Sequence, residues 1–135
     1  LILKTLNCIE MGTIKEKMQI GDISYAPKFK TIDTKINWNK SGSIIKNHIR
    51  AFSPYPGSYS KINKRRLKIY SADLVKNKKL KPGECEISNN QLIVGTKDHP
   101  LSLKYVQLEG KERMNINKFI DGNREIFLKE QFLDA

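Results

Sequence analysis

The chain has 135 residues, of which 39% are hydrophobic, so it is long enough and apolar enough to form one domain with a packed core. This composition excludes disorder of the whole chain, and no apolar run reaches the roughly 20 residues that a membrane-spanning helix needs. No secretory signal pattern is present either, which favours a cytoplasmic protein.

The formal net charge of +11 is concentrated in one segment. Residues 28–81 contain fifteen lysines and arginines but only two acids, whereas residues 1–27 are neutral and residues 82–135 are net negative. A segment of this kind attracts polyanions, with nucleic acid favoured over an acidic membrane surface. The alternative is a lysine bias of the whole proteome, but such a bias would not leave the C-terminal segment acidic.

Residues 1–11 have apolar side chains at helical spacing, and Gly12 is a natural end for that helix. Because the chain begins without methionine, we expect this helix to be the end of one that belongs to a missing N-terminal domain. Residues 12–35 are predicted to form an extended linker, since Pro27 disfavours helical geometry at this point. Residues 36–125 then form the domain proper, and residues 126–135 form a tail anchored by Phe127, Phe132 and Leu133.

The first element of this domain is a helix that begins at Ser41 or Ser43, either of which can cap it. Its predicted apolar face consists of Ile44, Ile45, Ile49 and Phe52. Residues after Gly57 alternate with a period of two and contain turn signals at regular intervals. The predicted strands are Ser58–Ile62, Arg66–Leu74, Pro82–Ser88, Gln91–Thr96 and Leu101–Leu108. Asn115 is expected to cap a last helix that ends at Asp121, so the fold class is mainly β with flanking helices, a small five-stranded barrel or sandwich.

No catalytic or metal-binding constellation is visible. Cys8 and Cys85 lie far apart and are predicted to be reduced thiols of a cytosolic protein. His48 and His99 lack an orienting carboxylate or a nucleophile at useful spacing and are interpreted as structural or surface residues. Phosphate-binding loops and nucleophile-elbow motifs are absent.

A binding surface is predicted instead on the hairpin formed by the first two strands. Arg66, Lys68 and Tyr70 share one face of a strand, opposite Leu67 and Ile69. Cations neutralise phosphates, and aromatic rings can stack on unpaired bases. The alternative for any one residue is a charged sheet edge that prevents strand pairing. The predicted nucleic-acid-binding residues are Lys28, Lys30, Lys35, Arg50, Lys61, Lys64, Arg65, Arg66, Lys68, Lys76, Lys78 and Lys79.

Several segments, in order, resemble the C-terminal domain of methionyl-tRNA formyltransferases. The most specific are Ile49-Arg50-Ala51-Phe52-Ser53-Pro54-Tyr55-Pro56-Gly57 and Gln107-Leu108-Glu109-Gly110-Lys111-Glu112-Arg113-Met114. Tyr25-Ala26-Pro27-Lys28, Ile36-Asn37-Trp38, Leu67-Lys68-Ile69 and Pro82-Gly83-Glu84 also match. The chain departs from the family pattern at Asn37, where an aspartate is usual, and at Asp98-His99-Pro100, where a glycine-rich turn is expected. Trp38 is interpreted as a core anchor, with a stacking platform as the alternative.

The resemblance implies an OB-like barrel joined by the linker to an absent catalytic domain. That domain would bind 10-formyltetrahydrofolate, whereas this chain would hold no cofactor and be inactive alone. The implied partners are initiator methionyl-tRNA and the N-terminal domain of the same protein, with the chain otherwise a monomer. A sugar-nucleotide N-formyltransferase with a similar C-terminal domain and a free-standing RNA-binding barrel remain as alternatives.

Overall fold

The computed structural model describes the backbone of residues 1–129 and the side chains of residues 1–126. Within residues 1–129, three α-helices, one short 3₁₀ helix and six strands follow one another. They are α1 (Ile2–Glu10), η1 (Thr31–Thr34), α2 (Gly42–Phe52), β1 (Ser58–Ile62), β2 (Arg65–Leu74), β3 (Cys85–Ser88), β4 (Gln91–Val94), β5 (Leu101–Leu108), β6 (Met114–Asn115) and α3 (Ile116–Lys129).

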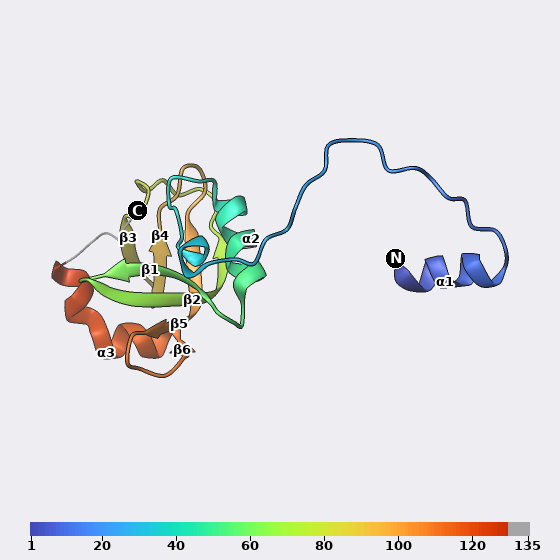
Figure 1. Cartoon of the computed structure of the whole chain (residues 1–135). Coiled ribbons are helices and arrows are strands. Elements are labelled where there is room, and N and C mark those ends of the chain that lie inside the picture. Colours follow the sequence, from blue (N-terminus) through green and yellow to red (C-terminus); the bar gives the residue numbers. More distant parts are fainter. Residues whose placement is uncertain (130–135) are drawn as a thin grey trace.

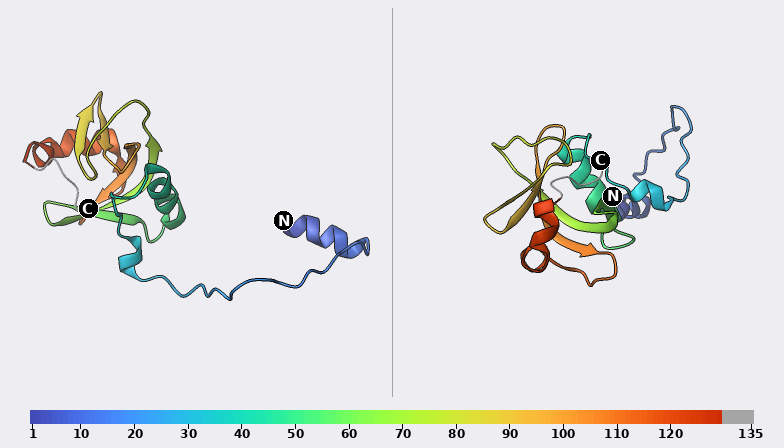
Figure 2. Two further views of the ribbon diagram at one scale, coloured as in Figure 1. Left: turned by 90° about the horizontal axis from the view of Figure 1, so that it is seen from above. Right: turned by 90° about the vertical axis from the view of Figure 1, so that its left-hand side faces the viewer.

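The strands form one antiparallel sheet in the order β1-β2-β5-β4-β3, with β6 paired to β5. Figure 1 shows α2 and α3 beside this sheet, so the predicted class, mainly β with flanking helices, is confirmed. Figure 2 shows the strands twisted around a common interior. Among the described residues, the paired strands form a row that ends at β1 and β3. Closure into an OB-like barrel therefore stays a prediction.

The strand bounds agree with the sequence prediction closely for β1 and β5 and within three residues elsewhere. β6, which is only two residues long, was not predicted. α3 also differs, because it continues past the predicted end at Asp121 to Lys129, with a non-helical backbone at Asn123. Its start is as predicted, since the Asn115 Oδ1 atom accepts the Asn117 N–H at 2.9 Å.

The core lies where the inward side chains of the sheet meet the helices. Leu67 and Ile69 of β2 are fully buried, and Ile45 and Ile49 of α2 pack into the same cluster. Trp38 is also fully buried, and its indole N–H donates to the Ser60 Oγ atom at 3.1 Å. The interpretation of Trp38 as a core anchor is therefore confirmed, because a buried ring with a satisfied N–H offers no face for stacking.

The start of α2 differs from the prediction. Ser41 stands at the cap position but makes no capping hydrogen bond through its side chain. The Asp98 Oδ1 atom, 56 residues further along the chain, instead accepts the Gly42 N–H at 2.7 Å. The same carboxylate accepts the His99 N–H, so Asp98 joins the β4–β5 turn to the helix start. Ile44 was assigned to the apolar face and is 53% exposed, because Ile45 and Ile49 fix the buried stripe one position further on.

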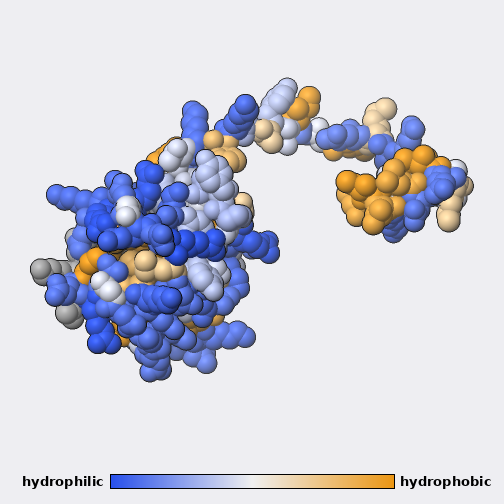
Figure 3. All heavy atoms as spheres, turned by 90° about the horizontal axis from the view of Figure 1, so that it is seen from below, coloured by the Kyte–Doolittle hydropathy of each residue, from blue (hydrophilic) through white to orange (hydrophobic). Residues whose placement is uncertain are grey.

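The N-terminal part of the chain lies apart from the sheet. α1 ends at the predicted glycine, since Gly12 has φ +65° and its N–H donates to the Ile9 carbonyl. No residue of α1 is buried, and Figure 3 shows apolar side chains gathered on this helix. Residues 13–30 form no helix or strand and run as an extended connector (Figure 1).

The end of the predicted linker is attached to the domain. Thr34 is buried, and the Ile36 N–H donates to the Tyr59 carbonyl at 2.8 Å, beside a parallel bridge between Lys35 and Tyr59. The division of the chain into domains stays a prediction. Of the predicted tail, residues 130–135 lie outside the described residues, as does the side chain of Phe127.

The capping role of Asp98 makes a prediction about stability and pH. Hydrogen bonds from the Gly42 and His99 N–H groups hold the pKa of the Asp98 carboxyl below its ordinary value of 3.8. A carboxyl with a lowered folded-state pKa stabilises the fold above its unfolded-state pKa, and this stabilisation is lost as the pH falls through the folded-state value. Asp98→Asn should therefore lower the melting temperature at neutral pH, and the difference from wild type should shrink below pH 3.8.

Thermal unfolding followed by circular dichroism from neutral to acidic pH measures this difference. Asp22→Asn, at an exposed position in the connector, is the matched control and should show no difference at any pH. A deficit for Asp98→Asn that stays constant into the acid range would contradict the role of the charge.

Candidate nucleic-acid interface

The outward face of β1, β2 and β5 brings the central basic residues together in two cross-strand rows. Lys61 lies opposite Arg66, whose carbonyl accepts the Glu109 N–H. In the next row Tyr59 lies opposite Lys68, which in turn lies opposite Gln107. Because side chains alternate along a strand, these residues point away from the core that Leu67 and Ile69 fill.

Two tyrosines on this face are covered by arginines. The Arg66 guanidinium lies 4.5 Å from the centroid of the Tyr59 ring, and the Arg113 guanidinium lies 4.3 Å from that of Tyr70. Both rings are accordingly buried, with 7% and 8% exposure. The prediction of a free Tyr70 ring beside Arg66 and Lys68 was wrong, because a cation from the β5–β6 connection occupies its face. The guanidinium groups of Arg66 and Arg113, and not the two rings, lie on the solvent side of this face.

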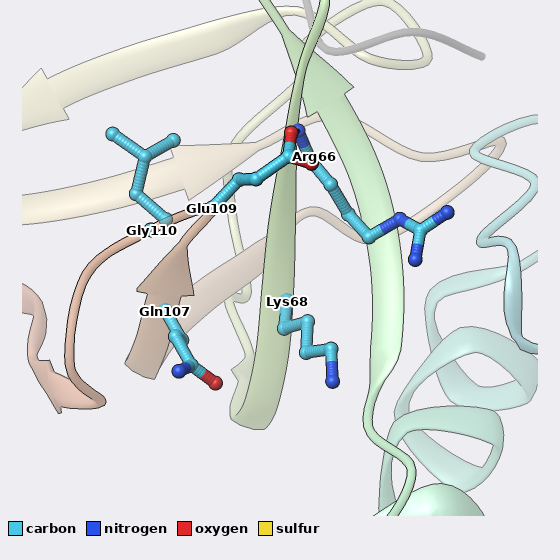
Figure 4. A pocket seen from close by; sticks show the side chains of 6 residues that line it. Arg66, Lys68, Gln107, Glu109 and Gly110 are labelled. Carbon is cyan, nitrogen blue, oxygen red and sulfur yellow. The ribbon is translucent and has the colours of Figure 1, made fainter.

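A shallow pocket of about 210 Å³ lies over the second and third strands of this face. Its lining residues are Arg66, Lys68, Gln107, Leu108, Glu109 and Gly110. Figure 4 shows the Lys68 and Gln107 side chains projecting on the same side of their strands. The Gln107 amide is held in place at both ends, since Oε1 accepts the Tyr70 hydroxyl at 2.6 Å and Nε2 donates to the Lys111 carbonyl at 2.9 Å. Lys68 and Arg66 are the cations that line this pocket.

One acid lies at the end of this face. The Glu109 Oε2 atom accepts the Arg66 N–H at 3.0 Å, and the Arg65 guanidinium donates to the Glu109 carbonyl at 2.7 Å. Arg65 is thus turned toward the β5 terminus, although it keeps its charge. Among the described residues no acid pairs with the side chain of Lys61, Lys64 or Lys68, and these cations remain available for an anion.

The remaining predicted residues lie in three other places. Lys28, Lys30 and Lys35 lie along the connector and η1, which the Lys35–Tyr59 bridge brings beside β1. Arg50 is exposed in the last turn of α2, in a groove that it shares with Tyr70. Lys76, Lys78 and Lys79 follow the far end of β2, about 30 Å from Arg65 at 3.3 Å per residue.

This distant lysine cluster is not an extension of the hairpin surface. The Lys78 ammonium donates to the Glu86 carboxylate at 2.5 Å. This ion pair neutralises one of the three positive charges of the cluster. The hairpin cations and this lysine cluster are therefore close in sequence but far apart in the fold.

The histidines have structural surroundings. The His48 Nε2 atom lies 2.9 Å from the Asp33 carbonyl and Nδ1 lies 3.1 Å from the Ser58 Oγ atom, so the ring joins η1, α2 and β1. His99 is exposed in the β4–β5 turn. Within residues 1–129 no three histidine, cysteine or acidic side chains lie close enough to hold a metal ion, and no helix is long and apolar enough to cross a membrane.

Burial raises the pKa of the Tyr70 hydroxyl above its ordinary value of 10.0, although the Arg113 guanidinium opposes this shift. Tyr70 consequently stays protonated at neutral pH and keeps its hydrogen bond to Gln107. Gln107, Tyr105 and Arg113 were not among the predicted site residues. For Gln107 and Arg113 a signal was present, because both belong to a motif that was noted only as part of a resemblance.

Comparison with known proteins covers the end of the connector, the sheet and most of α3 together. Residues 28–124 match the family model described as formyl transferase, C-terminal domain. The chain belongs to this family. The formyl transferase C-terminal domain thus covers all the residues of the basic sheet face, and the resemblance drawn from the sequence motifs is confirmed.

Curated relatives carry the name methionyl-tRNA formyltransferase. The protein from Thermodesulfovibrio yellowstonii is 38% identical over 92% of this chain and 40% of its own length. Those from Corynebacterium diphtheriae and Streptococcus thermophilus are 34% and 37% identical over 90% of this chain. The chain spans about two fifths of the length of these relatives.

A solved structure shares the fold at low sequence identity. HypX from Aquifex aeolicus, in a crystal structure with tetrahydrofolic acid, matches with a TM-score of 0.62 over 93% of this chain and 22% of its own. The identity is 18%, so this likeness extends the fold to a second protein and says nothing about the ligand of this chain.

The close approach of Gly57 to the Tyr70 ring predicts the effect of a substitution at Gly57. Gly57 has φ +87°, and a Cβ atom added there would lie 2.9 Å from the Tyr70 Cε1 atom. Gly57→Ala should therefore lower the free energy of unfolding by more than the roughly 1–2 kcal/mol that a left-handed backbone costs a non-glycine residue. Gly110→Ala is the matched control, since Gly110 has φ +75° with no atom within 4 Å of the added Cβ.

Urea unfolding of both variants, followed by Trp38 fluorescence, measures the difference. Equal losses in the two variants would show that the Tyr70 ring moves away at no cost.

Proposed function

We propose that this chain is the tRNA-docking C-terminal part of a methionyl-tRNA formyltransferase. In this role it holds initiator methionyl-tRNA so that the methionyl amino group reaches a catalytic domain elsewhere in the protein, where it is formylated for translation initiation. The family membership and the names of the relatives support this assignment.

The observation that carries the proposal is the row arrangement of unpaired cations on the outward sheet face. Lys61, Arg66 and Lys68 lie on adjacent strands at cross-strand positions, and Lys64 is at the tip of the same hairpin. Phosphate contacts of this kind supply affinity and register without reading sequence. This suits a domain that positions a tRNA while another part of the enzyme does the chemistry.

The chain contributes positioning rather than a catalytic group. The described residues include no histidine with an orienting carboxylate, and their recesses are open and lined by charged groups, unlike the enclosed slot that a pteridine ring needs. 10-Formyltetrahydrofolate is therefore expected to bind in the rest of the parent enzyme.

The N-terminal helix supports a second partner. Leu3, Leu6 and Ile9 of α1 are exposed at helical spacing, and this apolar side has no packing partner in the described chain. We assign it to contact with the N-terminal catalytic domain of the same protein, with residues 12–35 as the connection. On this proposal the whole protein is a cytoplasmic monomer.

A sugar-nucleotide N-formyltransferase is the alternative that the family likeness leaves open. A small nucleotide-sugar has few phosphates, and the segment with net charge +13 offers far more cations than it needs. A free-standing RNA-binding barrel is a further alternative, which the exposed apolar side of α1 disfavours.

Charge reversal on the hairpin tests the proposal. Lys61→Glu combined with Lys64→Glu should weaken binding of labelled initiator tRNA about ten-fold or more at low salt, because two phosphate contacts are lost. The slope of log affinity against log salt should also fall by about two, roughly one for each lysine. Fluorescence anisotropy at several salt concentrations measures both quantities.

The matched control is Lys4→Glu combined with Lys97→Glu, which changes the net charge equally at exposed positions off the sheet face. It should leave the salt slope close to that of the wild type. Equal weakening by the two double variants would mean that net charge, and not this surface, governs binding.

A further inference from the structure

A second recess adjoins the basic sheet face on the side of α3. It has a volume of about 590 Å³, which lies in the range of small-molecule pockets. Its lining residues are Tyr105, Glu112, Arg113, Met114, Asn115 and Lys118. None of them belongs to the surface on which the proposed phosphate docking depends.

The recess contains an aromatic ring that is open to solvent. Tyr105 of β5 is 44% exposed, whereas Tyr59 and Tyr70 on the same sheet are covered by guanidinium groups. The Arg113 guanidinium lies 5.4 Å from the Tyr105 centroid and 4.3 Å from that of Tyr70, so it is held between two rings. Tyr105 therefore offers an exposed ring next to a guanidinium group, and nucleobases stack on groups of both kinds.

The recess also contains donors without partners. Within the described part of the chain, Arg113 and Lys118 make no hydrogen bond or ion pair, and Glu112 is the one acid that lines the recess beside them. The Asn115 Oδ1 atom caps α3, which leaves its amide N–H₂ group free to donate. The recess thus has an excess of positive charge, which can bind a phosphate. The adjacent ring and amide can bind a base joined to that phosphate.

The recess is continuous with the basic face. Arg113 covers Tyr70, the Tyr70 hydroxyl donates to Gln107, and Gln107 lines the smaller pocket together with Lys68 and Arg66. A strand of RNA that leaves the recess therefore meets Lys68 next. Bases inside a duplex do not expose their faces to a side chain, so the ligand must be an unpaired nucleotide.

From this arrangement we infer that the recess between β5 and the start of α3 binds one unpaired nucleotide of an RNA. The base stacks on Tyr105 and Arg113, and its phosphate contacts Lys118. This inference rests on the proposed docking function and adds to it a contact with a base that the phosphate surface alone does not make.

Binding of a labelled single-stranded RNA hexamer to the full chain tests the inference. Tyr105→Ala should weaken hexamer binding by about ten-fold, because a base stacked on an aromatic ring loses its platform. Tyr105→Phe keeps the ring and should bind within two-fold of wild type. The salt slope should be the same in all three proteins, since no phosphate contact is removed, and equal melting temperatures exclude a purely structural effect.

Two further binding measurements identify the kind of nucleotide that the recess binds. A blunt RNA duplex should bind wild type and Tyr105→Ala equally, and 5′-AMP should compete with the hexamer only at far higher concentrations. Hexamer binding unchanged by Tyr105→Ala, or duplex binding weakened equally by it, would overturn the inference. Competition by 5′-AMP at the concentration of the hexamer would assign the recess to free mononucleotides and overturn it as well.

Failure of the docking proposal gives a different pattern. In that case Lys61→Glu with Lys64→Glu leaves tRNA affinity unchanged, whatever the Tyr105 variants do. The converse result is a hexamer affinity that Tyr105→Ala leaves unchanged and a tRNA affinity that falls in the lysine variant. That result would retain the docking surface and contradict only the nucleotide site.

Discussion

The pairing of β2 with both β1 and β5 is the constraint on which the rest of the structure depends. β2 is the longest strand, and its alternation sends Leu67 and Ile69 into the core while Arg66 and Lys68 face outward. A slip of one residue in either register would exchange these two sets and bury cations in an apolar cluster. The burial of the core side chains therefore fixes the positions of the surface cations, and the interface follows from the stability of the fold.

This arrangement carries an electrostatic cost. Lys61 and Arg66 lie directly opposite each other, and like charges at such positions destabilise a sheet. The structure offsets the repulsion in two ways that do not remove the charges. The Arg66 guanidinium stacks on the Tyr59 ring, and the Glu109 carboxylate accepts the backbone N–H of Arg66 at the strand end. The hairpin cations thus keep N–H donors for an anion, while the Arg66 guanidinium shields the Tyr59 ring from solvent.

Much of the fold could be predicted from local patterns, and several of the misses arise from contacts between residues far apart in sequence. The alternation of apolar and polar residues predicted β1 and β5, and Asn115 predicted the start of α3. Each of these features depends on residues close in sequence. The cap of α2 could not be found this way, since Asp98 comes from a turn 56 residues away. Lys76 and Lys79 were grouped with the hairpin by sequence proximity, whereas a ten-residue strand separates them in space. Tyr105 was missed because only the sheet brings it beside Arg113 and Tyr70, whereas Arg113 was noted only as part of a family motif.

The same geometry gives a physical reason for a polyanion as partner. The cross-strand repulsion that the isolated sheet tolerates would be relieved by phosphates lying between Lys61, Arg66 and Lys68, so binding and folding stabilise each other. A ligand with a single phosphate could relieve only part of it, since the two rows are about 7 Å apart along the strands. An extended run of phosphates matches both rows at once, and the open ring of Tyr105 lies beyond the second row, where such a backbone would present an unpaired base. The spacing of the rows therefore supports the proposal that this face binds RNA and not a nucleotide-sugar.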